Sequence, residues 1–447
     1  MSARRRTAAL ALACATAAGC ASAPKDAGFG DVRREVAEQT GAPVAWEPAA
    51  AIGPPDDTAI TPLLAEELTA DGAVRIALAN NRDVQATLEE LGVARGELLA
   101  AGTIRNPLFH AEVRFAGGGT NPIEIGLAQS LFDLLQIKGR KRMGRARFEA
   151  ARVQVTGAIV HFASQVRGDY FHLLAARQVL AQHGTVLKAQ EAAAELARRQ
   201  HAAGNISDLD LETEQSRYEQ VKLDHARARL DELTARESVL ADLGLVARAE
   251  LRLPDGFPPP PDVALTPEAA EEQAVSQRLD VRIARSEIEA AERALSLSRT
   301  QVLDETTIGV HHEREPEGKT TVGPEIEVPI PIFDRGAADR ARARAMLRQA
   351  RQRLHAITVS ARSEARAALD RHREAKARLD YIREVVVPRR ERILGLTQLE
   401  YNAMLRGVFQ LIEARQSLAD AQREEVLALR DYWIARTDLD VALLGVG

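Results

Sequence analysis

The sequence predicts a mainly α-helical protein with a small β part, in which long antiparallel helical hairpins are combined with four strands per chain. Three observations support this fold class. Aromatic residues make up only 4% of the 447 residues, while Ala, Leu, Arg, Glu and Gln dominate, as in long helices. Four short segments alternate apolar and polar side chains with the period of two that indicates strands. The same order of elements occurs twice along the chain.

The internal repeat has a period of about 200 residues. Leu265-Thr266 lies 197 residues after Leu68-Thr69, and Gly407 lies 203 residues after Gly204. A run of four prolines between the copies cannot be helical and indicates a linker. The predicted divisions are a first repeat over 67–252, a proline-rich linker over 253–265 and a second repeat over 266–447.

Each repeat begins with a helix, expected at about 70–103 and again at 267–300. A β-hairpin follows, at 108–131 in the first repeat and at 305–332 in the second, because apolar and polar side chains alternate there. A very long helical stretch and a returning helix complete each repeat. They are predicted at about 137–200 and 208–243, then at 337–403 and 410–443, with Gly184 and Pro388 expected to kink or interrupt the long stretches.

Composition and charge exclude several classes of function. The net charge is −5, from 59 Lys and Arg against 64 Asp and Glu, and it is spread along the chain, so a nucleic-acid partner is not expected. Two cysteines are too few for a disulfide framework or a Cys-rich zinc site. No nucleophile–base constellation and no phosphate-binding glycine loop is present, so we expect neither an enzyme nor a cofactor.

The N-terminus resembles the signal sequence of a bacterial lipoprotein. Residues 1–19 contain three arginines, an apolar stretch of about twelve residues and small residues before Cys20. Cys20 is therefore the predicted lipidation site, and 20–66 an extended lipoprotein segment. Ala17 departs from the usual Leu of this signal, and an ordinary signal peptide with an incidental cysteine is the alternative.

The predicted strands have the length needed to cross an outer membrane. An open sheet edge cannot be tolerated inside a bilayer, and four strands cannot close alone, because the smallest bacterial barrels have about eight. Two chains would give a filled barrel, whereas three would leave a lumen. The polar faces carry Glu112, Glu124, Glu325 and Glu327, which favours four transmembrane strands per chain and a trimer around water. Soluble hairpins that cap a coiled coil are the alternative.

These features together resemble the TolC outer-membrane efflux family, and within it the CusC/CzcC-type lipoprotein branch. The resemblance runs from about Leu63 to Leu444. It is most specific at the junctions SLFDLLQIKGRKR and PIPIFDRGAADRAR and at the helical turns AAGNISDLDLETEQSRYE and LEYNAMLRGVFQLIEARQSLADAQ. It implies that a homotrimer completes a β-barrel and an α-helical periplasmic tunnel.

The resemblance also implies a function and partners. Members of the family are exit ducts of tripartite efflux systems, which conduct substrate passively from an inner-membrane RND-type pump and a periplasmic adaptor (membrane fusion) protein to the exterior. We therefore expect a lipid-anchored protein in the cell outer membrane, in contact with its lipid. The alternatives are the exit duct of a type I secretion system and a periplasmic structural coiled-coil or adaptor protein.

The resemblance assigns a periplasmic gate to residues near the two helical turns. The gate residues it implies are Asp210, Tyr401, Arg406, Gln410 and Glu413, with Gln410 standing where the family has an acid. Charge-assisted hydrogen bonds among them would form a latch that an adaptor could exchange. In the alternative interpretation, Asp210 caps the returning helix and Glu413 is a solvated helix charge.

The turns themselves are the expected docking points for a periplasmic adaptor. The residues concerned are Gly204, Asn205, Ile206, Ser207, Gly407 and Val408. Glycine at a helix C-terminus can also have the purely structural role of adopting a positive φ.

The histidines do not predict a metal site. His311 and His312 are adjacent in a strand, so their side chains point to opposite faces and cannot readily share one ion. His110 lies in another predicted strand, and no HExxH motif or equally spaced ligand set is present. Solvated histidines are the expected interpretation.

Overall fold

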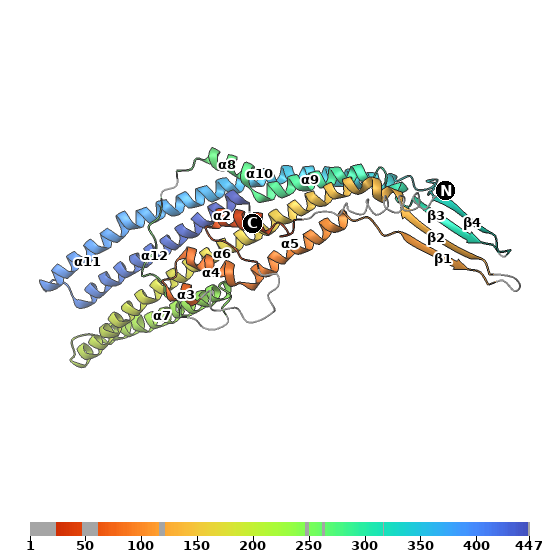
Figure 1. Cartoon of the computed structure of the whole chain (residues 1–447). Coiled ribbons are helices and arrows are strands. Elements are labelled where there is room, and N and C mark those ends of the chain that lie inside the picture. Colours follow the sequence, from red (N-terminus) through yellow and green to blue (C-terminus); the bar gives the residue numbers. More distant parts are fainter. Residues whose placement is uncertain are drawn as a thin grey trace. The chain divides into compact units, whose positions relative to one another are not determined.

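The computed structural model describes residues 24–46, 61–115, 121–245, 250–261, 264–315 and 317–445. Within them lie long helices and one four-stranded antiparallel sheet (Figure 1), so the predicted fold class, mainly α with a small β part, is confirmed. The predicted signal peptide and Cys20 lie outside the described residues. In the described part of the chain, no helix combines the length and the apolar character needed to cross a membrane.

The chain folds into two compact units, and each contains parts of both sequence repeats. The first unit comprises Met1–Val32, Leu88–Val155 and Leu279–Val359, and the second comprises Arg33–Thr87, Thr156–Arg278 and Ser360–Gly447. The two repeats are therefore not independent domains, because strands and helices of one repeat pack against those of the other.

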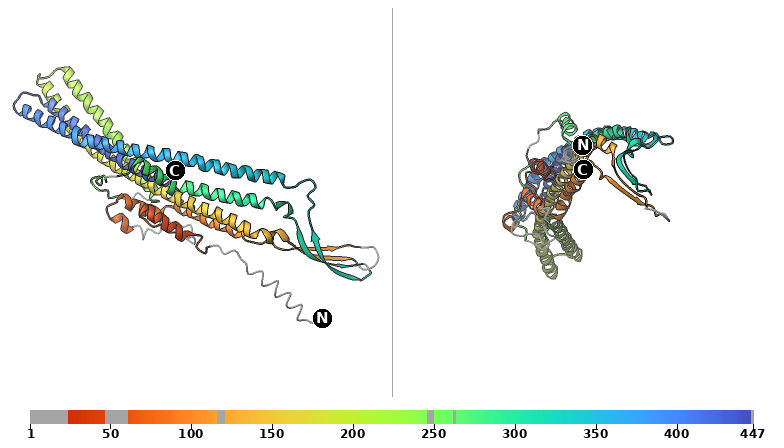
Figure 2. Two further views of the ribbon diagram at one scale, coloured as in Figure 1. Left: turned by 90° about the horizontal axis from the view of Figure 1, so that it is seen from above. Right: turned by 45° about the vertical axis from the view of Figure 1, so that its right-hand side comes forward.

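The sheet belongs to the first unit and joins the two repeats. Its strands are β1 (Leu108–Val113), β2 (Ile123–Ser130), β3 (Thr307–Arg314) and β4 (Thr320–Glu327), in the order β1-β2-β3-β4. β2 of the first repeat pairs with β3 of the second, from Ile123 opposite Arg314 to Ser130 opposite Thr307. Figure 2 shows the four strands running side by side.

The strands are shorter than expected, and β4 ends earlier than the alternation suggests. β1 has six residues and the other three have eight each, where nine or ten were expected. The apolar alternation continues to Ile332, yet the strand ends at Glu327. Pro329 and Pro331 have no N–H to donate to a ladder, which explains the early end. Pro324 is tolerated within β4 because this is an edge strand.

Helical hairpins dominate the second unit. The first pairs the end of α6 (Leu131–Ala202) with α7 (Asp208–Asp242), and the second pairs α11 (Val387–Asn402) with α12 (Val408–Leu444). α6 is continuous over 72 residues, so the expected interruption at Gly184 is wrong. One glycine costs a helix only about 1 kcal/mol, which the neighbouring turns offset.

Pro388 does mark an interruption in the second long stretch. α10 (Ala337–Tyr381) passes into a single π-helical segment, Ile382–Val386, and α11 then begins with Pro388 in its first turn. The missing N–H of a proline cannot make the usual i→i−4 hydrogen bond. A π segment widens the helix locally, so the chain passes the proline without ending the helix.

The expected opening helix of each repeat is broken at an equivalent residue. In the first repeat, Asn81 separates α4 (Ala70–Asn80) from α5 (Arg82–Ala101) and has an extended ψ angle of 127°. In the second repeat, Arg278 separates α8 (Pro267–Gln277) from α9 (Leu279–Leu297) and has an extended ψ angle of 134°. Asn81 Nδ2 donates to the carbonyl of Asp242 at 2.9 Å, and Arg278 Nη1 donates to that of Ala442 at 2.9 Å. The last carbonyls of a helix have no partner inside it. Each break thus brings a side-chain donor to the end of a returning helix.

Two buried clusters in the core of the second unit contain alanine. One buried cluster contains Ala270, Ala274, Ala365, Ala368, Leu369, Leu439 and Leu443. A second contains Leu379, Ile382, Ala428, Leu429 and Tyr432. The small side chains of the alanines allow the helix backbones to approach closely.

Candidate functional site

The two faces of the sheet differ sharply in chemistry. One face presents large apolar side chains that are 38–69% exposed in the single chain: Phe109, Val113, Ile125, Leu127, Ile308, Val310, Val322 and Ile326. The pairing register places the polar side chains together on the other face: His110, Glu112, Glu124, His311, Glu313, Glu325 and Glu327. An exposed apolar face of this extent indicates a surface that is covered in the functional protein.

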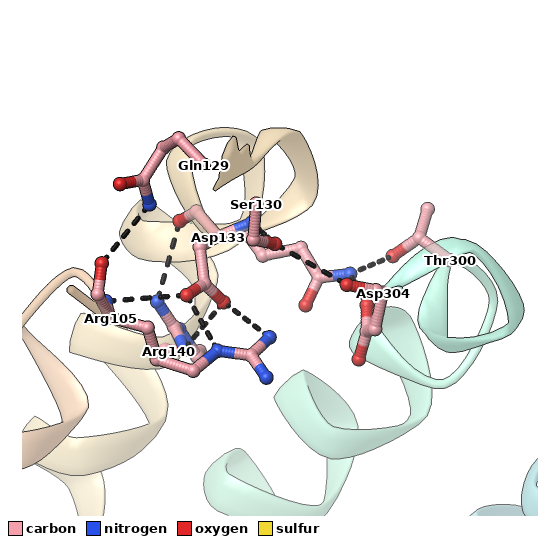
Figure 3. A network of polar contacts seen from close by, with 8 residues as sticks. Arg105, Gln129, Ser130, Asp133, Arg140, Thr300 and Asp304 are labelled. Atoms are coloured by element: carbon pink, nitrogen blue, oxygen red, sulfur yellow. Dashed lines mark hydrogen bonds and ion pairs between the residues drawn. The ribbon is translucent and has the colours of Figure 1, made fainter. Parts of the chain in front are cut away.

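An ion-pair network around the buried Asp133 holds the base of the sheet where β2 passes into α6 (Figure 3). Asp133 is only 3% exposed and accepts hydrogen bonds from Arg105 Nε at 2.7 Å and Arg140 Nη1 at 3.2 Å. The hydrogen bond from Arg105 holds the pKa of Asp133 below its usual value despite burial. Because Arg105 precedes β1 and Arg140 lies on α6, the network fixes the direction in which the strands leave the helices.

The same junction ties the two repeats together. Gln136 on α6 donates to Thr300 Oγ1 at 3.0 Å and also to the Asp304 carboxylate. Ser130 Oγ donates to the Asp304 carbonyl at 3.3 Å. Burial raises the pKa of Asp304. The repeated Phe-Asp pair plays a different part in the second repeat, where Asp334 accepts from its neighbour Gly336 and Phe333 is 99% exposed.

The two helical turns have nearly the same backbone, offset by 200 residues. In the first, Gly204 has φ +72° and Ser207 caps α7; in the second, Met404 has φ +60° and Gly407 caps α12. Asn205 N and Leu405 N each donate to a carbonyl five residues earlier, both at 2.9 Å. The structural partner of Gly204 is therefore Met404, and the expected match of Gly204 with Gly407 is wrong.

Asp210 and Gln410 occupy equivalent positions and both cap a helix. Ser207 Oγ donates to Asp210 Oδ2 at 2.7 Å, and the Asp210 N–H donates back to that hydroxyl at 3.2 Å. Gln410 Oε1 accepts from the Gly407 N–H at 3.0 Å. The Ser207 hydrogen bonds lower the pKa of Asp210. The capping role proposed as the alternative for Asp210 is thus present in the single chain.

The other predicted gate residues are exposed near the same turns. Arg406 Nε donates to Glu400 Oε2 at 2.7 Å. Tyr401 is 37% exposed, and Glu413 is also exposed on α12. In the described chain, Asp210 and Arg406 are therefore engaged with close neighbours rather than with each other. Their exposure leaves them accessible to other molecules.

The turn surface includes two residues that the sequence analysis missed. Of the predicted docking residues, Gly204, Asn205, Ser207 and Gly407 are exposed, while Ile206 and Val408 are half-buried. Met404 is 94% exposed and Leu405 is 77% exposed. Two consecutive large apolar residues in a polar interhelical turn are the sequence signal that could have identified them.

Cross-strand pairing brings histidines together that are distant in sequence. His311 and His312 do point to opposite faces, as expected. His110 and His311, however, lie on the same face, since both pair with Gly126, from its two sides. Local spacing cannot reveal this neighbourhood because 201 residues separate the two histidines.

Comparison with known proteins shows what this arrangement of sheet and helical hairpins is similar to. Residues 73–245 match the family model described as outer membrane efflux protein. This match confirms the resemblance to outer-membrane efflux proteins that the sequence indicates.

Particular relatives support the same assignment. The chain is 23% identical over 404 residues to the cobalt-zinc-cadmium resistance protein CzcC of Cupriavidus metallidurans, which covers 86% of this chain and 92% of the relative. The solved structure of CusC, described as forming a transmembrane channel, superposes with a TM-score of 0.69 at 18% identity, covering 85% of this chain and 92% of CusC. The CmeC outer membrane channel of Campylobacter jejuni gives a TM-score of 0.70 at 14% identity, covering 90% of each chain. The chain thus has the fold of these channels over most of its length.

Proposed function

We propose that three copies of this chain form the exit channel of a tripartite efflux system in the outer membrane. The observation that supports this most directly is the four-stranded sheet, which has one apolar and one polar face. The outer edges of its edge strands β1 and β4 have no partner strand in the described chain. The helical hairpins then form a periplasmic tunnel, and the channel conducts its substrate passively.

The argument for a trimer follows from closing the sheet. A free strand edge in a bilayer leaves backbone N–H and C=O groups without water, at a cost of several kcal/mol each. Pairing β4 of one copy with β1 of the next removes both edges. Three copies give twelve strands, enough to leave a lumen lined by the polar face, whereas eight strands would be filled by side chains. The apolar face then meets lipid.

The remaining assignments complete the proposal. The periplasmic adaptor docks on the turn surface, where Met404 and Leu405 provide the exposed apolar contact. The adaptor connects the channel to an inner-membrane RND-type pump. Acylation at Cys20, which lies outside the described residues, anchors each chain to lipid.

Fractionation of cells that express the full chain tests the channel. The expected result is an outer-membrane band at about three times the mass of one mature chain, which collapses to the mass of one chain only after heating. Purified protein should also give discrete conductance steps in planar bilayers. A soluble periplasmic monomer would refute the proposal.

We also propose that Asp210, Tyr401, Arg406, Gln410 and Glu413 form the periplasmic gate of the trimer. Their carboxylate, guanidinium and phenol groups are exposed close to the turns, where helices of neighbouring chains would meet. Charge-assisted hydrogen bonds between chains would hold the pore narrow, and a docked adaptor would exchange them.

Replacement of Asp210 by Ala separates this gate from simple helix capping. Asp210→Ala is expected to raise single-channel conductance because it removes the carboxylate that would pair with a neighbouring chain. Ser207→Ala is the matched control, since it breaks the same capping box but keeps that carboxylate. Higher conductance in Asp210→Ala than in Ser207→Ala supports the gate, and parental conductance in both variants contradicts it.

A further inference from the structure

The polar face of the sheet holds two rows of metal-ligating side chains. In one row, His110 of β1 and His311 of β3 flank Gly126 of β2. In the next row, Glu112, Glu124 and Glu313 lie directly opposite one another on the same three strands. Adjacent rows on one face are two residues apart along each strand, so imidazole and carboxylate groups are neighbours.

The distances between their ligand atoms are close to those around a single ion. His110 Nε2 lies 3.9 Å from Glu112 Oε2, and His311 Nδ1 lies 3.6 Å from Glu124 Oε1. His110, Glu112 and Glu124 each present a ligand atom within 4.8 Å of the other two. Two ligands bound to Zn²⁺ at about 2.0–2.2 Å are roughly 3–4 Å apart. Small rotamer adjustments of exposed side chains are enough to close this set.

Gly126 leaves the space between the histidines open. It is the residue that pairs with both His110 and His311, and it has no side chain to separate them. A Cβ at this position would lie 3.8 Å from His110 Cβ and 3.8 Å from Glu325 Oε2. Groups of three different strands therefore converge over one glycine.

The charge of this surface favours a cation. Glu112, Glu124 and Glu313 are balanced in part by Arg114, whose Nε is 2.8 Å from Glu112 Oε1 and whose Nη2 is 3.0 Å from Glu124 Oε2. The Arg114 side chain is 57% exposed, so it can turn away towards water. A divalent ion would replace this guanidinium and form bonds to the same oxygens.

We infer that His110, Glu112 and Glu124, joined by His311 from β3, form a binding site for a divalent transition-metal ion of the Zn²⁺ or Co²⁺ type. Mixed imidazole and carboxylate ligands favour such ions over Ca²⁺ and Mg²⁺, which prefer oxygen alone. All four ligands belong to the sheet of one chain, so metal binding does not require the trimer. The position of the site in a channel lumen rests on the proposed function.

Metal titration of the full chain in detergent tests the binding. Metal-free protein is titrated with Co²⁺ and followed by visible absorption, and with Zn²⁺ by calorimetry. We expect one ion per chain. The double variant His110→Ala/His311→Ala is expected to weaken binding at least about 100-fold, because it removes two direct ligands. Glu124→Gln should also weaken binding, while keeping the shape of the side chain.

His312 and Arg114 provide matched controls. His312 is adjacent to His311 but on the opposite face, so His312→Ala should leave the affinity within about twofold of the parent. Arg114→Ala removes the competing guanidinium and should tighten binding. Equal affinity in the parent and the double variant, or an equal loss in His312→Ala, would overturn the site.

Zn²⁺ block in planar bilayers separates the site from the channel proposal. If both are right, Zn²⁺ lowers the conductance of the parent but not that of the double variant. If the protein binds Zn²⁺ in detergent but forms no conducting trimer, the site stands and the proposed function fails. If conducting trimers form without one tightly bound ion per chain, the site fails and the channel stands.

Discussion

At the scale of single residues, the two helical turns show that one backbone can be built with different side chains. Gly204 and Met404 both adopt the left-handed region, at φ +72° and +60°. Glycine does so without strain, whereas a residue with a Cβ pays about 1 kcal/mol. Met404 is also almost fully exposed, so no packing in the single chain offsets this strain. The second turn is therefore strained, and it presents an exposed apolar side chain at its apex.

Exchanging these residues tests that interpretation. Met404→Gly should raise the free energy of unfolding by about 1 kcal/mol, and Gly204→Ala should lower it by a similar amount, because only a Cβ at a positive φ is strained. Thermal unfolding followed by circular dichroism measures both changes. If Met404 contacts an adaptor, Met404→Gly will also weaken adaptor binding, which separates the two roles. A loss of stability in Met404→Gly would contradict the strain.

At the scale of elements, the end of α7 places the carboxyl group of Asp242 near that of Asp169 on α6. Asp242 is 8% exposed, and Asp169 is half-buried. Gln165 donates to Asp242, at 3.5 Å. Burial, reinforced by Asp169, raises the pKa of Asp242 to about 7. The Asp242 carboxyl is thus protonated at mildly acidic pH.

This pair makes stability depend on pH in a defined window. The folded chain binds more protons than the unfolded chain between the ordinary pKa of 3.8 and about 7, so the free energy of unfolding should fall as pH rises through that range. Asp242→Asn mimics the protonated form and should be more stable than the parent by about 2 kcal/mol at pH 8. The variant and the parent should differ little at pH 4. Melting temperatures at both values measure this, and an equal difference at the two would contradict it.

How far each element could be predicted depended on whether its signal was local. The alternation around Phe109 and Ile326 predicted the two faces of the sheet, because a period of two is written in consecutive residues. The breaks at Asn81 and Arg278 were missed, since their side chains cap helix ends about 160 residues away. The pairing of β2 with β3 and the resulting neighbourhood of His110 and His311 were missed for the same reason. Register between distant strands is decided by tertiary packing.

At the scale of the whole molecule, the repeats intermix, and the proposed membrane attachment would rest on two independent signals. The apolar sheet face would insert by itself, and acylation of Cys20 would add a lipid anchor. Cys20→Ser should abolish incorporation of labelled palmitate while heat-modifiable trimers still reach the outer membrane. Cys14→Ser is the matched control, because it changes the only other cysteine and should keep the label. Label retained in Cys20→Ser would disprove the anchor, and soluble Cys20→Ser protein would disprove independent insertion.

The pairing of β2 with β3 also determines how long β2 must wait for its partner strand during synthesis. Arg314, the partner of Ile123, is synthesised 191 residues later. At roughly 5–20 residues per second, the inner edge of β2 waits on the order of ten to forty seconds for its partner. During that interval, the first hairpin has one apolar face, and the inner edge of β2 has no partner strand. Such an edge has a strong tendency to pair with strands of other chains. A chaperone must therefore bind the chain early, when only its first half has been synthesised.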